Sequence, residues 1–166
     1  MKKLGIILAV CILVWGCGAR ENEYSTNPPP QAQQPLAAVS GQTEPSSLVQ
    51  EGIDHLQDAE IAEAISSFDN AIRQDPLNPD PYIILGETYL RLKNYSRAVD
   101  TFSAAERIAP QRGDIQYFLA IGHGLMGKED LAKVHARKSI ELFRQDEDEE
   151  NFLKAVALLQ GLLAAK

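Results

Sequence analysis

Residues 64–76 read AISSFDNAIRQDP, and residues 98–110 read AVDTFSAAERIAP. When the two stretches are aligned, Ala, Phe, Ala and Pro occupy matching positions that are always 34 residues apart. Gly52 and Gly86, further upstream, keep the same separation. A period of this length is typical of stacked helical pairs, in which each pair buries its apolar face against the next one. The stretch therefore predicts an all-α solenoid.

Apolar residues around the two stretches recur at the spacing of amphipathic helices. In the first stretch the series runs through Ile61, Ala64, Ile65, Phe68, Ala71 and Ile72. Asp75-Pro76 and Ala109-Pro110 then end their units, because proline cannot continue a helix interior. The sequence thus predicts helical pairs that are closed by proline.

The second unit resembles the tetratricopeptide repeat, a helix–turn–helix unit with an aromatic, Leu-Gly, Tyr, Ala, Phe, Ala, Pro pattern. The residues that carry the resemblance are Tyr82, Leu85, Gly86, Tyr89, Ala98, Phe102, Ala105 and Pro110. The first unit keeps most of the pattern. The third is weaker, with Ala120 for the glycine, Ala136 for the phenylalanine and Arg144 for the proline. The resemblance implies a short right-handed solenoid of three repeats within residues 47–146, at about 45–78, 79–112 and 113–146, and a capping helix within 147–166.

The amino terminus has the pattern of an export signal. Met1-Lys2-Lys3 is basic, and Leu4 to Trp15 is almost wholly apolar. Residues 1–16 are therefore predicted to be a secretory signal peptide, since the apolar run is shorter than the roughly 20 residues of a membrane-spanning helix. Gly16-Cys17 resembles the lipobox of bacterial lipoproteins. That resemblance implies cleavage before Cys17 and its modification by acyl chains such as palmitate; the alternative is a plain signal peptide or uncleaved anchor with an incidental cysteine.

Residues 17–46 are predicted to be a disordered tether, because they are rich in Pro and Gln and poor in large apolar residues. A proline-rich ligand for another module is the alternative. Two or more acyl chains on Cys17 would hold the tether firmly at a membrane. In the enterobacterial sorting rule, Gly18 after the cysteine implies delivery to the outer membrane, with the protein facing the periplasm.

The formal net charge of −7 and the lack of a basic cluster argue against nucleic-acid binding. Residues 122–127 match G-x-G-x-x-G, but the match lies in a predicted helix instead of between a strand and a helix, so nucleotide binding is not expected. His55 and His123 hold equivalent repeat positions without further ligand spacing, and are expected to pack in the interior. No catalytic constellation is found, so we expect neither an enzyme nor a cofactor nor a metal.

The family's register implies a concave groove that is lined by the first helix of each repeat. Its expected lining residues are Val49, Ile53, Ile83, Glu87, Leu90, Tyr117 and Ile121. Asp80 and Asp114 are expected at its edge, and no basic residue occupies the positions where some family members clamp an acidic tail. The predicted ligand is an amphipathic helix or an extended apolar segment of a protein. The alternative is that these residues only pack against each other.

These observations predict an adaptor or scaffold that acts in envelope complex assembly. One alternative is a pilotin-like assembly factor for a secretin or a type IV pilus, by analogy with lipidated repeat proteins. An alternative of another class is a cell-wall hydrolase or its cofactor, which would need the missing catalytic constellation. The last helix, expected from Asn151 to Ala165 behind a run of carboxylates, is apolar over much of its circumference. It therefore predicts either burial under the third repeat or self-association.

Overall fold

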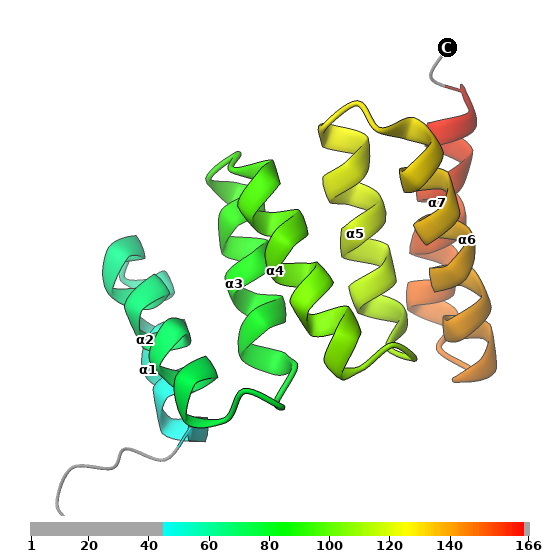
Figure 1. Cartoon of the computed structure of the whole chain (residues 1–166). Coiled ribbons are helices and arrows are strands. Elements are labelled where there is room, and N and C mark those ends of the chain that lie inside the picture. Colours follow the sequence, from blue (N-terminus) through cyan, green and yellow to red (C-terminus); the bar gives the residue numbers. More distant parts are fainter. Residues whose placement is uncertain (1–44, 165–166) are drawn as a thin grey trace, which may run out of the picture. The chain divides into compact units, whose positions relative to one another are not determined.

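The computed structural model describes residues 45–164, and within this range the chain forms seven α-helices and no strand (Figure 1). The helices are α1 (Pro45–Gln57), α2 (Ile61–Gln74), α3 (Asp80–Arg91), α4 (Tyr95–Ile108), α5 (Gly113–Leu125), α6 (Glu129–Gln145) and α7 (Glu149–Ala164). The all-α prediction is confirmed. The predicted signal peptide, Cys17 and nearly all of the tether lie outside the described residues.

Two helix boundaries differ from the predictions. α1 begins at Pro45, inside the range predicted as tether, because proline without a backbone N–H fits the first turn of a helix. α7 begins at Glu149, two residues before Asn151. Its start is fixed by Asp148, whose carboxylate accepts a hydrogen bond from the backbone N–H of Asn151 (3.1 Å).

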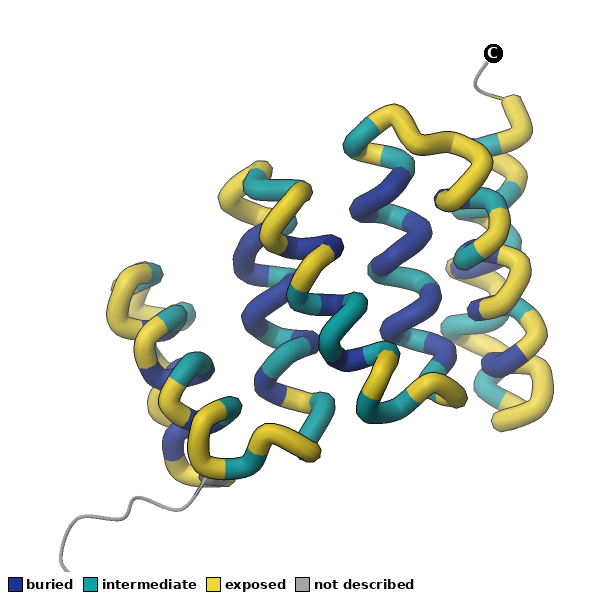
Figure 2. The backbone as a smooth tube through the Cα atoms, in the orientation of Figure 1, coloured by how far each residue is buried: buried dark blue, intermediate teal, exposed yellow. Residues whose placement is uncertain are grey.

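The helices pack as successive antiparallel pairs in two layers. Each helix packs against the one before and the one after it, and α3 contacts α5 as α5 contacts α7. The odd-numbered helices therefore form one layer and α2, α4 and α6 the other (Figure 1). Figure 2 shows that the buried positions concentrate on α3 and α5, which have neighbours on both sides.

Small residues in the first helix of a pair let aromatic rings of the second helix approach closely. The rings of Phe68 and Phe102 are fully buried and lie against Gly52 and Gly86. A Cβ added to either glycine would lie 2.5 Å from a ring carbon, which is closer than real contacts allow. The Gly and Phe positions of the 34-residue pattern therefore form one packing unit.

Three of the turns that join helices share one geometry. Ala59, Lys93 and Gly127, each 34 residues from the next, have positive φ between the two helices of a pair. Glu147 has the same conformation between α6 and α7. In all four turns the residue that follows donates a backbone hydrogen bond five positions back, as from Asn94 to Tyr89 (2.9 Å). The α6–α7 connection is thus built like a turn within a repeat.

Within residues 45–164, no helix combines the length and the apolar character that a membrane span requires.

Candidate functional site: the inner face

The surface of the odd-numbered layer carries six of the seven residues that were predicted to line a groove. We call these six half-buried positions the inner face: Val49, Ile53, Glu87, Leu90, Tyr117 and Ile121. Val49, Ile53 and Leu90 also pack against the hydrophobic core with part of their side chains. These three side chains therefore contribute to packing and still offer surface to solvent, and binding of a ligand at the inner face stays a prediction.

Ile83 was predicted as an exposed groove residue, and this prediction is wrong. Its side chain is only 6% exposed and belongs to the core cluster. Val49 and Tyr117 hold the equivalent positions of the neighbouring repeats and are half-buried. Val49 differs because α1 stands at the end of the stack, whereas α3 contacts α2, α4 and α5. Tyr117 stays half-buried although α5 has neighbours on both sides, as α3 has.

Glu87 is the only charged member of the inner face. Its carboxylate is half-buried on α3, and its pKa is raised, chiefly because burial disfavours the charged form. Attraction by Arg91 opposes this rise and repulsion by Asp114 adds to it. The inner face is therefore apolar with a single partly desolvated carboxylate at its centre.

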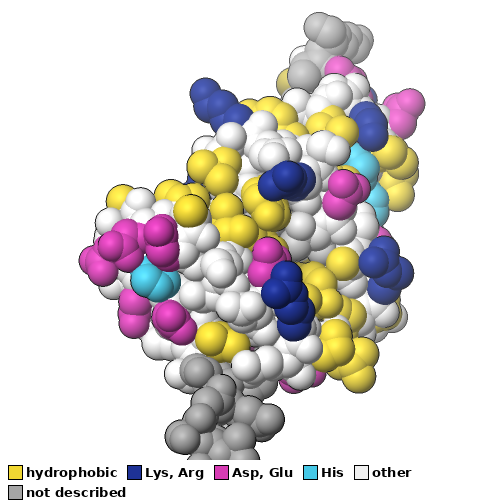
Figure 3. All heavy atoms as spheres, turned by 60° about the vertical axis from the view of Figure 1, so that its left-hand side comes forward, with side chains coloured by type: hydrophobic (Ala, Val, Ile, Leu, Met, Phe, Trp, Pro, Cys, Tyr) yellow, Lys and Arg dark blue, Asp and Glu magenta, His cyan; other side chains and the backbone are white. Residues whose placement is uncertain are grey.

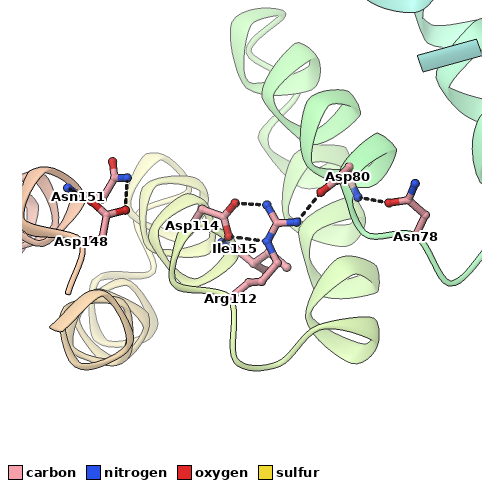
Figure 4. Close-up of polar contacts among 7 residues, drawn as sticks. All are labelled: Asn78, Asp80, Arg112, Asp114, Ile115, Asp148 and Asn151. Carbon is pink, nitrogen blue, oxygen red and sulfur yellow. Dashed lines mark hydrogen bonds and ion pairs between the residues drawn. The ribbon is translucent and has the colours of Figure 1, made fainter. Parts of the chain in front are cut away.

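The edge of the inner face is less acidic than the sequence predicted. Arg112, in the loop between α4 and α5, forms ion pairs with both Asp80 and Asp114 (Figure 4). Its Nη2 lies 2.5 Å from Asp114 Oδ2, and its Nε donates a second bond to the same carboxylate (3.1 Å). One guanidinium thus joins the first turns of α3 and α5 and neutralises part of the charge of the two aspartates.

Sequence reasoning missed Arg112 because it lies outside the helices that were expected to line the groove. Asp80 and Asp114 are 34 residues apart and hold equivalent positions at the starts of α3 and α5. A cation in the loop that separates two equivalent aspartates was the signal that could have indicated this bridge.

The third repeat covers only part of the apolar surface of α7. Ala155 is its one buried residue, and Leu162 lies near Gly124 of α5. Leu153 and Leu163 of the same helix are 56% and 52% exposed. α7 is therefore covered along one side only, and self-association through it stays a prediction.

The two histidines that were expected to pack in the interior differ. His123 is buried, whereas His55 is half-buried at the surface, where its Nδ1 lies 2.6 Å from Glu60 Oε2. The contact with Glu60 raises the pKa of His55.

Figure 3 shows a histidine among acidic side chains at one edge, and hydrophobic side chains with scattered charges across the middle of that view. Among residues 45–164, no three His, Cys, Asp or Glu side chains are placed to hold a metal ion.

The glycine motif at residues 122–127 has a packing role. It spans the end of α5 and the turn to α6, so it lacks the strand that a phosphate-binding loop follows. A Cβ on Gly122 would lie 2.7 Å from Val99 Cγ2 of α4, and Gly127 takes the positive φ of the turn. Gly122 and Gly127 are therefore explained by close helix packing and by turn geometry.

The comparisons with known proteins agree with this architecture. A family model described as "Tetratricopeptide repeat" matches residues 49–112. Superkiller protein 3 of Saccharomyces cerevisiae is 31% identical over 70 residues, which are 42% of this chain and 5% of that protein. The chain thus spans a small fraction of the length of this curated relative.

Solved structures share the fold at low sequence identity. PcrH from Pseudomonas aeruginosa has a TM-score of 0.69 and 21% identity, over 78% of this chain and all of that chain. PcrH in complex with the chaperone binding region of PopD scores 0.68 at 19% identity, over 76% and 97% of the two chains. The first TPR domain of Spaghetti (RPAP3), bound to the HSP90 peptide SRMEEVD, scores 0.66 at 20% identity, over 74% and 92%. The described helices therefore have the tetratricopeptide-repeat fold.

Proposed function

We propose that this chain, whose residues 49–112 belong to the tetratricopeptide-repeat family, is a scaffold that binds a segment of a partner protein on its inner face. The observation that carries the proposal is the half-buried state of Leu90, Tyr117 and Ile121 on α3 and α5, helices that are otherwise largely buried. Apolar side chains that stay partly exposed beside a packed core are suited to binding another protein.

The solved neighbours support binding of a peptide. RPAP3 holds an HSP90 peptide and PcrH holds a region of PopD, each in a fold that this chain shares. The HSP90 peptide ends in acidic residues, whereas Glu87 places a carboxylate at the centre of this inner face. We therefore infer that the ligand of this chain differs in charge from that peptide. The described residues offer no catalytic constellation, which favours a scaffold over an enzyme.

Membrane presentation is the second part of the proposal. The amino-terminal pattern that ends in Gly16-Cys17 supports a lipid anchor, and the tether predicted over residues 17–46 would give the repeats reach from the membrane. In a Gram-negative host the scaffold would face the periplasm from the outer membrane and act in the assembly of an envelope complex. Cys17→Ala is expected to move the protein from the membrane fraction to the soluble periplasmic fraction. Unchanged fractionation, with a wild-type protein that is clearly membrane-bound, would refute the anchor.

The inner face is tested by photocrosslinking in living cells. The photoreactive residue benzoylphenylalanine replaces Tyr117 or Ile121 in one set of cells, and Val134 in a matched control set. Val134 is an exposed apolar residue on α6, in the opposite layer. We expect discrete adducts from the two inner-face positions and none from Val134, with partners identified by mass spectrometry. Equal adducts from all three positions, or adducts from Val134 alone, would reject the inner face as the binding site.

A further inference from the structure

The inner face leaves one charged side chain without a partner. No hydrogen bond or ion pair joins the half-buried carboxylate of Glu87 to another residue of the described range. Arg91 follows one helical turn later, but it is exposed and acts on Glu87 only by longer-range attraction. A carboxylate that is partly removed from water and unpaired is costly for the free protein and well placed to receive a cation.

The arginine at the edge of the inner face is already paired with other carboxylates. Arg112 pairs with Asp80 and with Asp114, so its guanidinium is committed to the two edge carboxylates (Figure 4). Asp114 still acts on Glu87, because it contributes to the rise of the Glu87 pKa. Glu87, Asp80 and Asp114 carry three negative charges against the two positive charges of Arg112 and Arg91, so these five residues keep an excess of one negative charge.

Apolar side chains accompany this carboxylate. Leu90 lies one turn from Glu87 on α3, and Tyr117 and Ile121 lie on α5, which contacts α3 directly. Tyr117 packs edge-on against Phe118, whose ring stacks on that of Phe102 at 5.1 Å, so this part of the face stands on the rigid core. A ligand that pairs a cationic group with the Glu87 carboxylate would therefore meet ordered apolar surface on either side.

We propose that the inner face recognises a partner segment in which one Lys or Arg pairs with Glu87 while flanking apolar side chains pack on Leu90, Tyr117 and Ile121. The pairing rests on the proposed function and adds to it the charge of the ligand. Charge complementarity selects this occupant, because a segment that presented a carboxylate or an uncharged residue at the same place would leave Glu87 desolvated and unpaired.

Random peptides displayed on phage test the pairing without knowledge of the natural partner. The full chain, held in detergent, is used as wild type, as Glu87→Gln and as Glu87→Lys. The wild type is expected to select peptides with Lys or Arg between apolar residues. The Gln variant should lose that cation preference, and the Lys variant should replace it with Asp or Glu. Glu63→Gln is the matched control, since Glu63 is an exposed glutamate of α2, in the other layer, and the cation preference should remain.

The affinities of one selected peptide for the wild type and for the variants then measure the contribution of the ion pair between Glu87 and the cationic residue of the peptide. Replacement of its cationic residue by norleucine is expected to weaken binding to the wild type about tenfold, as for a partly desolvated charge pair. The same replacement should change binding to Glu87→Gln little, because the carboxylate has already gone. Circular dichroism of each variant must match the wild type, which separates a lost contact from a lost fold.

The outcomes separate the two proposals. Peptides that need Tyr117 and Ile121 but show no cation preference would overturn the pairing and leave the scaffold function standing. Selection of no peptide that depends on the inner face would overturn both. Selected sequences that match residues 1–44 of this chain would name an internal occupant and overturn binding of a separate partner at this face.

Discussion

The second repeat (α3 and α4) and the third repeat (α5 and α6) share one fold but fill their interiors with different chemistry. In the second repeat the buried ring of Phe102 lies against Gly86. The equivalent residues of the third repeat are Ala136 and Ala120, both fully buried. The pair of phenylalanine and glycine is thus replaced by a pair of alanines, which leaves the third repeat with less apolar volume at this position.

Polar side chains occupy the interior of the third repeat. Gln116 is fully buried, donates to Glu106 Oε1 (2.8 Å) and accepts from His135 Nδ1 (2.8 Å). The ring of His135 stacks on that of His123 at 5.3 Å, and the buried Nδ1 of His123 has no hydrogen-bond partner among the described residues. The comparison teaches that one backbone accepts either an apolar or a polar interior. Only the polar interior contains histidines, whose ordinary pKa lies near neutral pH.

Removing the aromatic ring of the second repeat should have the largest effect. Phe102→Ala is expected to lower the free energy of unfolding by about 3–5 kcal/mol, because it creates a cavity in the centre of the stack. Urea unfolding followed by circular dichroism measures the loss. Leu92→Ala, at a half-exposed position in the turn after α3, is the control and should change stability by about 0.5 kcal/mol or less. Equal effects of the two substitutions would contradict the assignment of Phe102 to the core.

The effect on stability of replacing Gly86, which lies against the Phe102 ring, should change sign when the ring is removed. Gly86→Ala should destabilise the wild type by about 1–3 kcal/mol, since its Cβ would overlap the Phe102 ring. In the Phe102→Ala background the same change should stabilise, because alanine favours the helix by up to about 1 kcal/mol and fills part of the cavity. That double variant reproduces the Ala120–Ala136 pair of the third repeat. A Gly86→Ala effect of the same sign in both backgrounds would show that the ring and the glycine do not form a unit.

Much of the fold could be predicted, because the solenoid repeats a local packing unit. Gly52, Gly86, Phe68 and Phe102 needed only their 34-residue spacing to be assigned to helix contacts, and the structure places them there. The start of α7 was predicted two residues late. Residues 146–150 are five successive carboxylates, and the sequence does not indicate that Asp148 is the one that caps the helix while Glu149 and Glu150 already belong to it.

The candidate site was less predictable, because exposure depends on neighbours that are distant in sequence. Val49, Ile83 and Tyr117 have the same place in the pattern, yet only Ile83 is buried. Val49 is on α1, which stands at the end of the stack, whereas α5 has helices on both sides as α3 has, so the number of neighbouring helices does not account for Tyr117. The bridge from Arg112 to Asp80 joins residues that are 32 positions apart, so it could be indicated only by the equivalence of Asp80 and Asp114 across the repeats and not by a helical period. Register thus predicted which layer a residue lies in, and the packing of adjacent repeats determined how far it is exposed.

The turns within the two repeats provide a smaller test of the same comparison. Lys93 and Gly127 hold equivalent positions with φ of 57° and 72°. Lys93→Gly should stabilise the second repeat by up to about 1 kcal/mol, because glycine adopts positive φ without steric cost. Gly127→Ala should destabilise the third by a similar amount. Thermal unfolding of both variants measures the effects, and a stabilising Gly127→Ala would contradict the turn geometry.

Stability in acid should distinguish the two interiors. The loss of stability between neutral and acidic pH that comes from the third repeat is expected to be smaller than the effects above. Burial lowers the pKa of His123 and of His135 below 6.5. His135 and Lys128 lower the pKa of His123 further, and Lys138 that of His135, while Glu106 acts in the opposite direction on both. The unfolded chain therefore binds more protons at these sites. Their contribution is fully present above pH 6.5 and is lost as the pH falls through the folded pKa values.

Conversion of the stacked pair to the residues of the second repeat tests the source of this response. His123→Tyr with His135→Thr introduces the side chains of Tyr89 and Thr101 at the equivalent positions. The urea midpoint of the wild type should fall more between about pH 7.5 and about pH 5.5 than that of the double variant, because the remaining titratable groups are common to both chains. His55→Tyr is the control of opposite sign. Since contact with Glu60 raises the pKa of His55, its contribution grows as the pH falls, and its loss should steepen the acid response. An equal fall in wild type and double variant would mean that the polar interior of the third repeat is not the acid-sensitive part of the stack.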